Sequence, residues 1–137
     1  MMISEKNLMN GIFGMKIIDK NMKIIVLGST GMLGNYVEKF LMKKYNVISL
    51  NRDKLDASDV NYNKLKSIFV QHEVNSDDVV INCIGTIKPR VDQLGDLNAI
   101  LVNSVFPRLL SKLSKEFNFK VIHPTTDCVY TDSKGNY

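Results

Sequence analysis

The sequence of 137 residues lacks the features that mark membrane, secreted and metal-binding proteins. No apolar run approaches the roughly 20 residues of a membrane span, and residues 1–21 have neither the apolar core nor the cleavage site of a signal peptide. Cys83 and Cys128 show no metal-ligand spacing, and two thiols in an intracellular chain are usually reduced and buried. We therefore expect a cytoplasmic protein with no membrane contact and no metal site.

Charge of one sign is not concentrated anywhere in the chain. The 18 Lys and Arg residues are interleaved with 14 Asp and Glu residues, for a net charge of +4. We interpret this distribution as a solvated surface and expect no nucleic-acid partner. The basic segment 88–90 is interpreted as an exposed loop, the alternative being positive charge near a substrate diphosphate. The length suits one globular domain.

Strand and helix patterns alternate along most of the chain. Residues 1–21 show no sustained periodicity and are predicted to be a loose extension, and residues 54–58 are too few for more than a small strand. The alternation predicts an α/β fold, a doubly wound parallel sheet with helices on both faces. Strands are predicted at 22–27, 46–50, 77–82 and 119–123, and helices at 32–44, 60–72 and 94–117, with a kink or restart at Pro107. The first helix is amphipathic, with Leu33, Val37, Phe40 and Leu41 on its apolar face.

Three glycines follow the first strand at intervals of three residues, in the segment 28–34. They lie between a strand and a helix, where backbone N–H groups and the helix dipole can hold a diphosphate. Glycine permits positive φ in a tight turn and close approach of a phosphate or a neighbouring strand. The context predicts a dinucleotide site, and a purely structural turn is the alternative.

The spacing Gly-x-x-Gly-x-x-Gly resembles the extended short-chain dehydrogenase/reductase family, and within it the dTDP-4-dehydrorhamnose reductases and related reductases of nucleotide sugars. Further segments resemble this family in the same order, at 51–56, 79–85, 102–103 and 123–130. The resemblance implies a Rossmann-type NAD(P)-binding domain over residues 22–137. It also implies that the domain is truncated at its C-terminal side, before the family's Tyr-x-x-x-Lys helix and substrate-binding part.

The resemblance also implies which residues contact the cofactor. Backbone donors of the glycine loop would hold its diphosphate, from Gly28, Thr30, Gly31, Met32, Leu33 and Gly34. The segment after the middle strand would pass the adenosine ribose and the nicotinamide side, with Cys83, Ile84, Gly85 and Thr86. A buried thiol without a chemical role is the alternative for Cys83.

The residues after the second strand favour NADP(H), with NAD(H) also possible. Asn51 occupies the position where an acidic residue would bind both ribose hydroxyls of NAD, and Arg52 beside it would attract a 2′-phosphate. An exposed loop cation is the alternative for Arg52. Asp56 and Ala57 match the adenine-contacting pair of the family, and a turn-capping aspartate is the alternative for Asp56.

The activity implied by the resemblance is hydride transfer to the C4 carbonyl of a dTDP- or UDP-linked 4-keto-6-deoxysugar. Thr126 matches the hydroxyl that holds the carbonyl oxygen, and a threonine that caps a turn is the alternative. The family's catalytic tyrosine and lysine have no match in the chain, because the segment 130–134 follows the last strand too closely and overlies another family segment. We therefore expect a fragment or truncated homologue that does not turn over alone.

Two other functions stay open at this point. One is a non-catalytic dinucleotide-binding subunit or sensor, and the other is a nucleotide-sugar epimerase or dehydratase with the same half-fold. Truncation after the last strand would leave it as an edge with unpaired backbone groups and would uncover an apolar face of the sheet. We therefore expect an oligomer or a partner to cover that edge.

Overall fold

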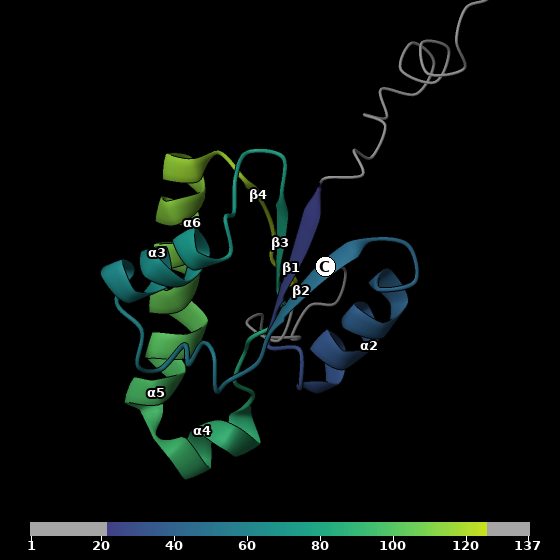
Figure 1. Ribbon diagram of the computed structural model, residues 1–137. Helices are drawn as coiled ribbons and strands as arrows, with labels where there is room; N and C mark the ends of the chain where they lie inside the picture. Colours follow the sequence, from purple (N-terminus) through teal and green to yellow (C-terminus); the bar gives the residue numbers. More distant parts are fainter. Residues whose placement is uncertain (1–21, 126–137) are drawn as a thin grey trace, which may run out of the picture.

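The computed structural model describes residues 22–125 (Figure 1). The predicted extension 1–21 and the candidate Thr126 lie outside the described residues. The described chain forms a parallel sheet with the strand order β2-β1-β3-β4, which confirms the predicted doubly wound arrangement. Its strands are β1 (Lys23–Leu27), β2 (Asn46–Leu50), β3 (Val79–Asn82) and β4 (Lys120–Ile122).

Helices lie on both faces of the sheet, as Figure 1 shows. One face carries α2, and the other carries α3 and α6, so the chain crosses to β2 on one side and returns to β3 on the other. The helices are α2 (Met32–Leu41), α3 (Tyr62–Gln71), α4 (Lys88–Leu94), α5 (Asp96–Ile100) and α6 (Phe106–Phe117), with a π-helix, η1 (Leu101–Val105), between the last two. Because the strand order reverses at β1, the loops after β1 and β3 lead to opposite faces of the sheet and leave room for a ligand between them.

The main core fills the space between the sheet and the pair α3 and α6. Leu65 and Phe69 of α3 and Phe106 of α6 are fully buried there, and the rings of Phe69 and Phe119 lie 5.3 Å apart. The strand β1 is buried on both faces, from Ile24 to Leu27, as expected for the centre of a parallel sheet. Packing in this core fixes the position of the sheet, and with it the position of the carboxyl ends of the strands.

A buried carboxylate joins the amino ends of β1 and β3. Asp78 is only 1% exposed, and it accepts hydrogen bonds from the backbone N–H groups of Lys23 at 2.8 Å and Asn75 at 2.9 Å. The ammonium group of Lys23 lies 3.5 Å from the same carboxylate and donates to the carbonyl of Glu73. These bonds compensate the cost of burying the charge and set the start of both strands.

The structure corrects three details of the sequence prediction. Residues 54–58 form turns and not a small strand. The carboxylate of Asp56 accepts a hydrogen bond from the backbone N–H of Ser58, and this local contact favours a turn. Helix α4 was missed, since the segment around Pro89 is too short for a helical period to be visible. The helix predicted at 94–117 is present as α5, η1 and α6, and the irregular turn comes just before Pro107. Proline has no N–H for the carbonyl of Asn103, so a regular α-helical bond is impossible there.

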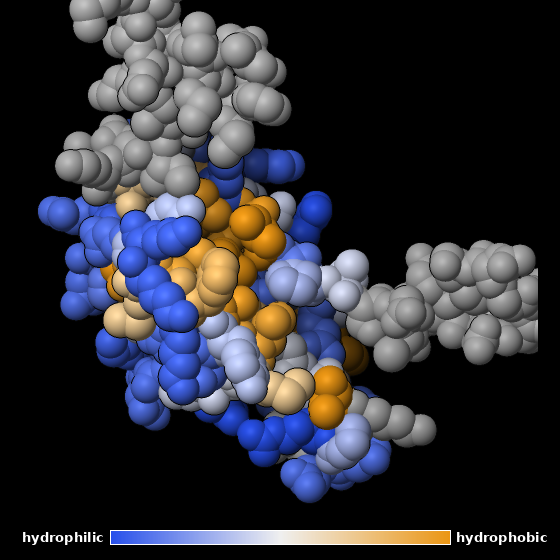
Figure 2. Space-filling model, turned by 90° about the vertical axis from the view of Figure 1, so that its right-hand side faces the viewer, coloured by the Kyte–Doolittle hydropathy of each residue, from blue (hydrophilic) through white to orange (hydrophobic). Residues whose placement is uncertain are grey.

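Helix α2 has the predicted position, but most of its large apolar side chains are exposed. Tyr36 is 74% exposed and Phe40 70%, whereas Gly34 is the only buried residue of the helix. Figure 2 shows apolar side chains gathered on the face of the molecule that carries α2. At the sheet edge, Ile122 of β4 is 52% exposed. Within residues 22–125, the edge strand β4 and the apolar side chains of α2 are thus exposed, and the oligomer or partner that would cover them stays a prediction.

Among residues 22–125, no helix is both long enough and apolar enough to cross a bilayer.

The approach of α2 to the loop after β1 gives a first prediction. A Cβ atom at Gly34 would overlap with the carbonyl oxygen of Gly28, which is backbone and cannot move aside. We expect Gly34→Ala to lower the free energy of unfolding by about 1–3 kcal/mol, measured by thermal and denaturant unfolding. In a helix without this contact, Gly→Ala would raise the free energy of unfolding by roughly 1 kcal/mol. The direction of the change therefore shows whether α2 packs closely against Gly28.

The matched control for this prediction is Gly85→Ala. A Cβ at Gly85 would have its nearest neighbour at 3.8 Å, which is an ordinary contact. Equal stability of the Gly34→Ala and Gly85→Ala variants would contradict the close approach.

Candidate functional site

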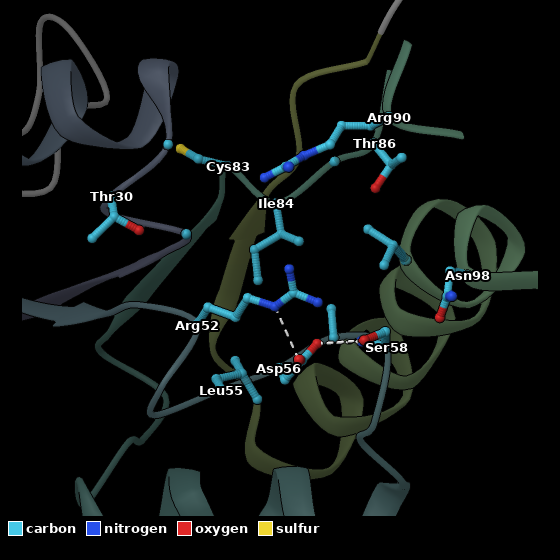
Figure 3. Close-up of a pocket in the computed structure, with 15 residues that line it drawn as sticks. Thr30, Arg52, Leu55, Asp56, Ser58, Cys83, Ile84, Thr86, Arg90 and Asn98 are labelled. Carbon is cyan, nitrogen blue, oxygen red and sulfur yellow. Dashed lines mark hydrogen bonds and ion pairs between the residues drawn. The ribbon is translucent and has the colours of Figure 1, made fainter. Parts of the chain in front are cut away.

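A cavity of about 200 Å³ opens at the carboxyl ends of β1, β2 and β3 (Figure 3). The three loops that follow these strands form most of its wall, and α4, α5 and η1 close one side. Its lining residues are Gly28, Thr30, Gly31, Arg52, Leu55, Asp56, Ala57, Ser58, Cys83, Ile84, Gly85, Thr86, Arg90, Asn98 and Val102. The position is the one at which open parallel sheets bind ligands.

Gly28 directly follows β1 and contacts both the end of β2 and the loop after β3. Its φ of 75° lies in the left-handed region, and its N–H donates to the carbonyl of Leu50 at 2.8 Å. A Cβ at this position would lie 2.9 Å from Cγ1 of Ile84, in the loop after β3. Glycine is therefore required here by both the backbone conformation and the available space.

The N-terminus of α2 faces the cavity without a side-chain cap. Gly31 is the N-cap residue and makes no side-chain hydrogen bond, and the first turn of the helix contains no acidic residue. The first backbone N–H groups of an α-helix have no partner inside the helix. Because Gly31 lines the cavity, these donors and the positive end of the helix dipole are available to an anion there.

Arg52 and Asp56 form an ion pair on the wall that follows β2. Nε of Arg52 lies 3.0 Å from Oδ2 of Asp56, whose Oδ1 accepts from the N–H and the hydroxyl of Ser58 (Figure 3). Burial raises the pKa of Asp56, but the hydrogen bonds from Ser58 and Arg52 outweigh it and hold this pKa below its ordinary value. The turn-capping contact considered for Asp56 is thus present, together with a contact that orients Arg52.

Asn51 does not line the cavity. Its side-chain oxygen accepts from the N–H of Lys54 at 3.2 Å, and its amide nitrogen donates to Asp53 at 3.3 Å. The amide therefore fixes the turn after β2 and leaves the wall of the cavity to Arg52.

The loop after β3 is held at both ends by asparagine side chains. Asn82 is buried, and its Oδ1 accepts from the N–H of Ile84 at 3.1 Å, while its amide nitrogen lies 3.0 Å from Nδ1 of His123. Asn103 in η1 accepts from the N–H of Thr86 and donates to its carbonyl, both at 2.8 Å. The two-point contact ties the cavity wall to the π-helix.

Cys83 lies on this wall as a half-buried free thiol. Burial raises the pKa of the thiol, which disfavours the thiolate. The position gives no support to a nucleophilic role.

Within residues 22–125, no three His, Cys, Asp or Glu side chains lie close enough to hold a metal ion.

Most of the residues predicted to contact a cofactor line this one cavity, the exceptions being Met32, Leu33, Gly34 and Asn51. Met32 and Leu33 project outward from α2, and Gly34 packs beneath Gly28. The structure adds Leu55, Ser58, Arg90, Asn98 and Val102. Leu55 and Ser58 flank the predicted pair 56–57, but the place of Arg90 depends on α4, which the sequence pattern did not reveal.

A family model described as RmlD substrate binding domain matches residues 22–137. The chain belongs to this family. The resemblance to dTDP-4-dehydrorhamnose reductases that the sequence indicated is thereby confirmed. A comparison with curated protein sequences gave no significant match.

Solved structures share the fold of this RmlD-family chain. A dTDP-4-dehydrorhamnose reductase from Clostridium acetobutylicum has a TM-score of 0.70 and 27% identity, over 84% of this chain and 40% of that one. A dTDP-4-dehydrorhamnose reductase from Bacillus anthracis in complex with NADP has a TM-score of 0.68 and 20% identity, over 82% and 39%. The L780 UDP-rhamnose synthase from Acanthamoeba polyphaga mimivirus has a TM-score of 0.63 and 20% identity, over 80% and 38%. The chain thus spans about two fifths of the length of these proteins.

The contact between Asn103 and Thr86 gives a second prediction. Asn103→Ala removes both hydrogen bonds between its side chain and the backbone of Thr86, so we expect the amide of Thr86 to exchange with solvent faster by about fivefold or more. Hydrogen exchange resolved by NMR or mass spectrometry measures this rate. Ser104→Ala, in the same π-helix, is the control and should leave the rate unchanged. Equal exchange rates of the Thr86 amide in the two variants would show that the hydrogen bonds from Asn103 do not restrain the loop.

Proposed function

We propose that the chain is the NAD(P)H-binding half of a reductase of nucleotide-linked 4-keto-6-deoxysugars, similar to dTDP-4-dehydrorhamnose reductase. The observation that supports it most is the uncapped N-terminus of α2 beside Gly28 and Gly31, at the switch point of the sheet. A Cβ at Gly28 would lie 2.9 Å from Cγ1 of Ile84, so this close packing of the loops after β1 and β3 requires glycine. The donors fit a diphosphate, which is the group that two nucleotides share in NAD(P)H.

The cofactor would lie across the carboxyl ends of β1, β2 and β3. Its diphosphate would lie against the glycine loop, whose residues Gly28, Thr30 and Gly31 line the cavity. It would accept from the first N–H groups of α2, in Met32, Leu33 and Gly34, because the N–H groups of Gly28 and Gly31 already donate to the carbonyls of Leu50 and Gly28. The adenine would lie toward Asp56 and Ala57, and the ribose and nicotinamide toward Cys83, Ile84, Gly85 and Thr86. When bound, the reduced nicotinamide would supply a hydride for a sugar carbonyl.

Arg52 supports a preference for NADP(H) over NAD(H). Its Nε donates to Asp56, which leaves the two Nη groups of the guanidinium for another anion. Its side chain is 62% exposed, so a 2′-phosphate could reach it from solvent. Asn51 carries no charge that would repel that phosphate, and its amide is already used in the turn.

The sugar-reductase part of the proposal is supported by the family and by the names of the similar structures. Thr126, outside the described residues, remains the proposed hydroxyl that holds the carbonyl oxygen. In the sequence it follows β4, which is parallel to the strands whose carboxyl ends form the cavity. The proposed substrate is a dTDP- or UDP-linked sugar.

Binding of the cofactor gives a third prediction. We expect calorimetric titration to show tighter binding of NADPH than of NADH, and Arg52→Gln to reduce that preference by about tenfold. Arg108→Gln is the control, because it removes the same charge from an exposed position on α6 that does not line the cavity. Binding of neither dinucleotide would overturn the proposed function. A preference that survives Arg52→Gln would remove Arg52 from the cofactor site.

Turnover gives a fourth prediction. With a dTDP- or UDP-linked 4-keto-6-deoxysugar, we expect oxidation of NADPH, followed at 340 nm, only when the chain is joined to or mixed with a segment that supplies a Tyr-x-x-x-Lys helix. Thr126→Val in the same preparation should lower kcat by about 100-fold and leave NADPH binding unchanged. Tight binding without turnover in that preparation would favour the dinucleotide-binding subunit or sensor instead.

A further inference from the structure

Two arginines reach the same cavity from opposite sides of the central strand. Arg52 follows β2, and Arg90 lies in α4 after β3, while β1 runs between these two strands in the sheet. In Figure 3 both guanidinium groups extend into the cavity, and in this view the side chain of Ile84 lies between them. Segments almost 40 positions apart in the sequence thus bring two positive charges to one place.

The charges that line the cavity are not balanced. Its charged lining residues are Arg52, Arg90 and Asp56. Asp56 is already engaged, by Arg52 through Oδ2 and by Ser58 through Oδ1. Among the residues that the structure describes, the side chain of Arg90 has no hydrogen bond or ion pair. One positive charge in the cavity therefore lacks a counter-charge there.

Arg90 is held in place by its backbone. Its N–H donates to the carbonyl of Ile87 at 2.9 Å, in the first turn of α4. Ile87 follows Thr86, whose backbone N–H and carbonyl both form hydrogen bonds with the side chain of Asn103. The base of the side chain is thus fixed relative to the cavity wall, and little backbone ordering is needed for it to meet a ligand.

We propose that Arg90 is a second specificity residue, which contacts the 2′-phosphate of NADP(H) together with Arg52. This inference rests on the proposed cofactor site. A phosphate monoester carries nearly two negative charges at neutral pH and has three acceptor oxygens, so it can bind two guanidinium groups at once. Its insertion would also screen the repulsion between two like charges that share a small cavity.

The test compares NADPH with NADH, which differ only by this phosphate, and 2′-AMP with 5′-AMP, which carry one phosphate at different positions of the ribose. Wild-type protein, Arg90→Gln and Arg108→Gln are titrated calorimetrically with NADPH, NADH, 2′-AMP and 5′-AMP at low and physiological salt. We expect Arg90→Gln to weaken NADPH and 2′-AMP by about three- to tenfold and to change NADH and 5′-AMP by less than about twofold. Arg108→Gln should change none of them, and Arg90→Lys should retain part of the preference.

The outcomes separate this inference from the proposed function. If the wild-type protein prefers NADPH and Arg90→Gln keeps the full preference, the role of Arg90 fails and the cofactor site stands. If Arg90→Gln weakens NADPH and NADH equally, the guanidinium contacts a part that both dinucleotides share and not the 2′-phosphate, and the inference fails. If the wild-type protein binds neither dinucleotide, both the proposed function and this inference fail. Unfolding curves of each variant test whether it is folded. We expect Arg90→Gln to unfold like the wild-type protein, because Arg90 is exposed.

Discussion

The close approach of three backbone segments at Gly28 is the constraint on which the rest of the site depends. The N–H of Gly28 bonds to the end of β2, its carbonyl accepts from Gly31, and the space for a Cβ is filled by Ile84 after β3. Helix α2 packs on the same carbonyl through Gly34. A side chain at Gly28 or Gly34 would push apart the strands, the helix or the loop. The glycines therefore permit the packing first, and the uncapped helix terminus that could bind an anion results from it.

The sheet order turns this local packing into a cavity with a defined polarity. Since β2 and β3 flank β1, their loops supply opposite walls, with Arg52 on one and Thr86 on the other. The walls are stabilised differently. Arg52 is oriented by a side-chain ion pair, whereas the backbone of Thr86 is held by Asn103 from η1. The π-helix before Pro107 thus links a break in helical hydrogen bonding to the shape of the site.

The sequence was sufficient for the features that depend on local pattern. The four strands and the helices α2, α3 and α6 follow from apolar periodicity, and most of the cavity-lining residues follow from the family resemblance that the glycine spacing and four further segments indicated. The missed features depend on contacts between distant segments. Helix α4 is too short to show a period, so Arg90 read as an exposed loop cation. The exposure of Phe40 could not be read from its helical spacing either, because the pattern marks an apolar face and does not say what covers it.

Binding and discrimination would rest on different kinds of groups in this cavity. The donors near Gly31 are backbone groups whose position is set by the packing of α2, so they respond little to salt or to surface substitutions. The guanidinium of Arg52 is largely exposed, and its attraction to a phosphate is screened as the ionic strength rises. Backbone groups positioned by the fold would thus hold the parts that NADH and NADPH share, and exposed cations would contact the 2′ position. Cofactor preference can therefore change by substitution at the rim without loss of the site itself.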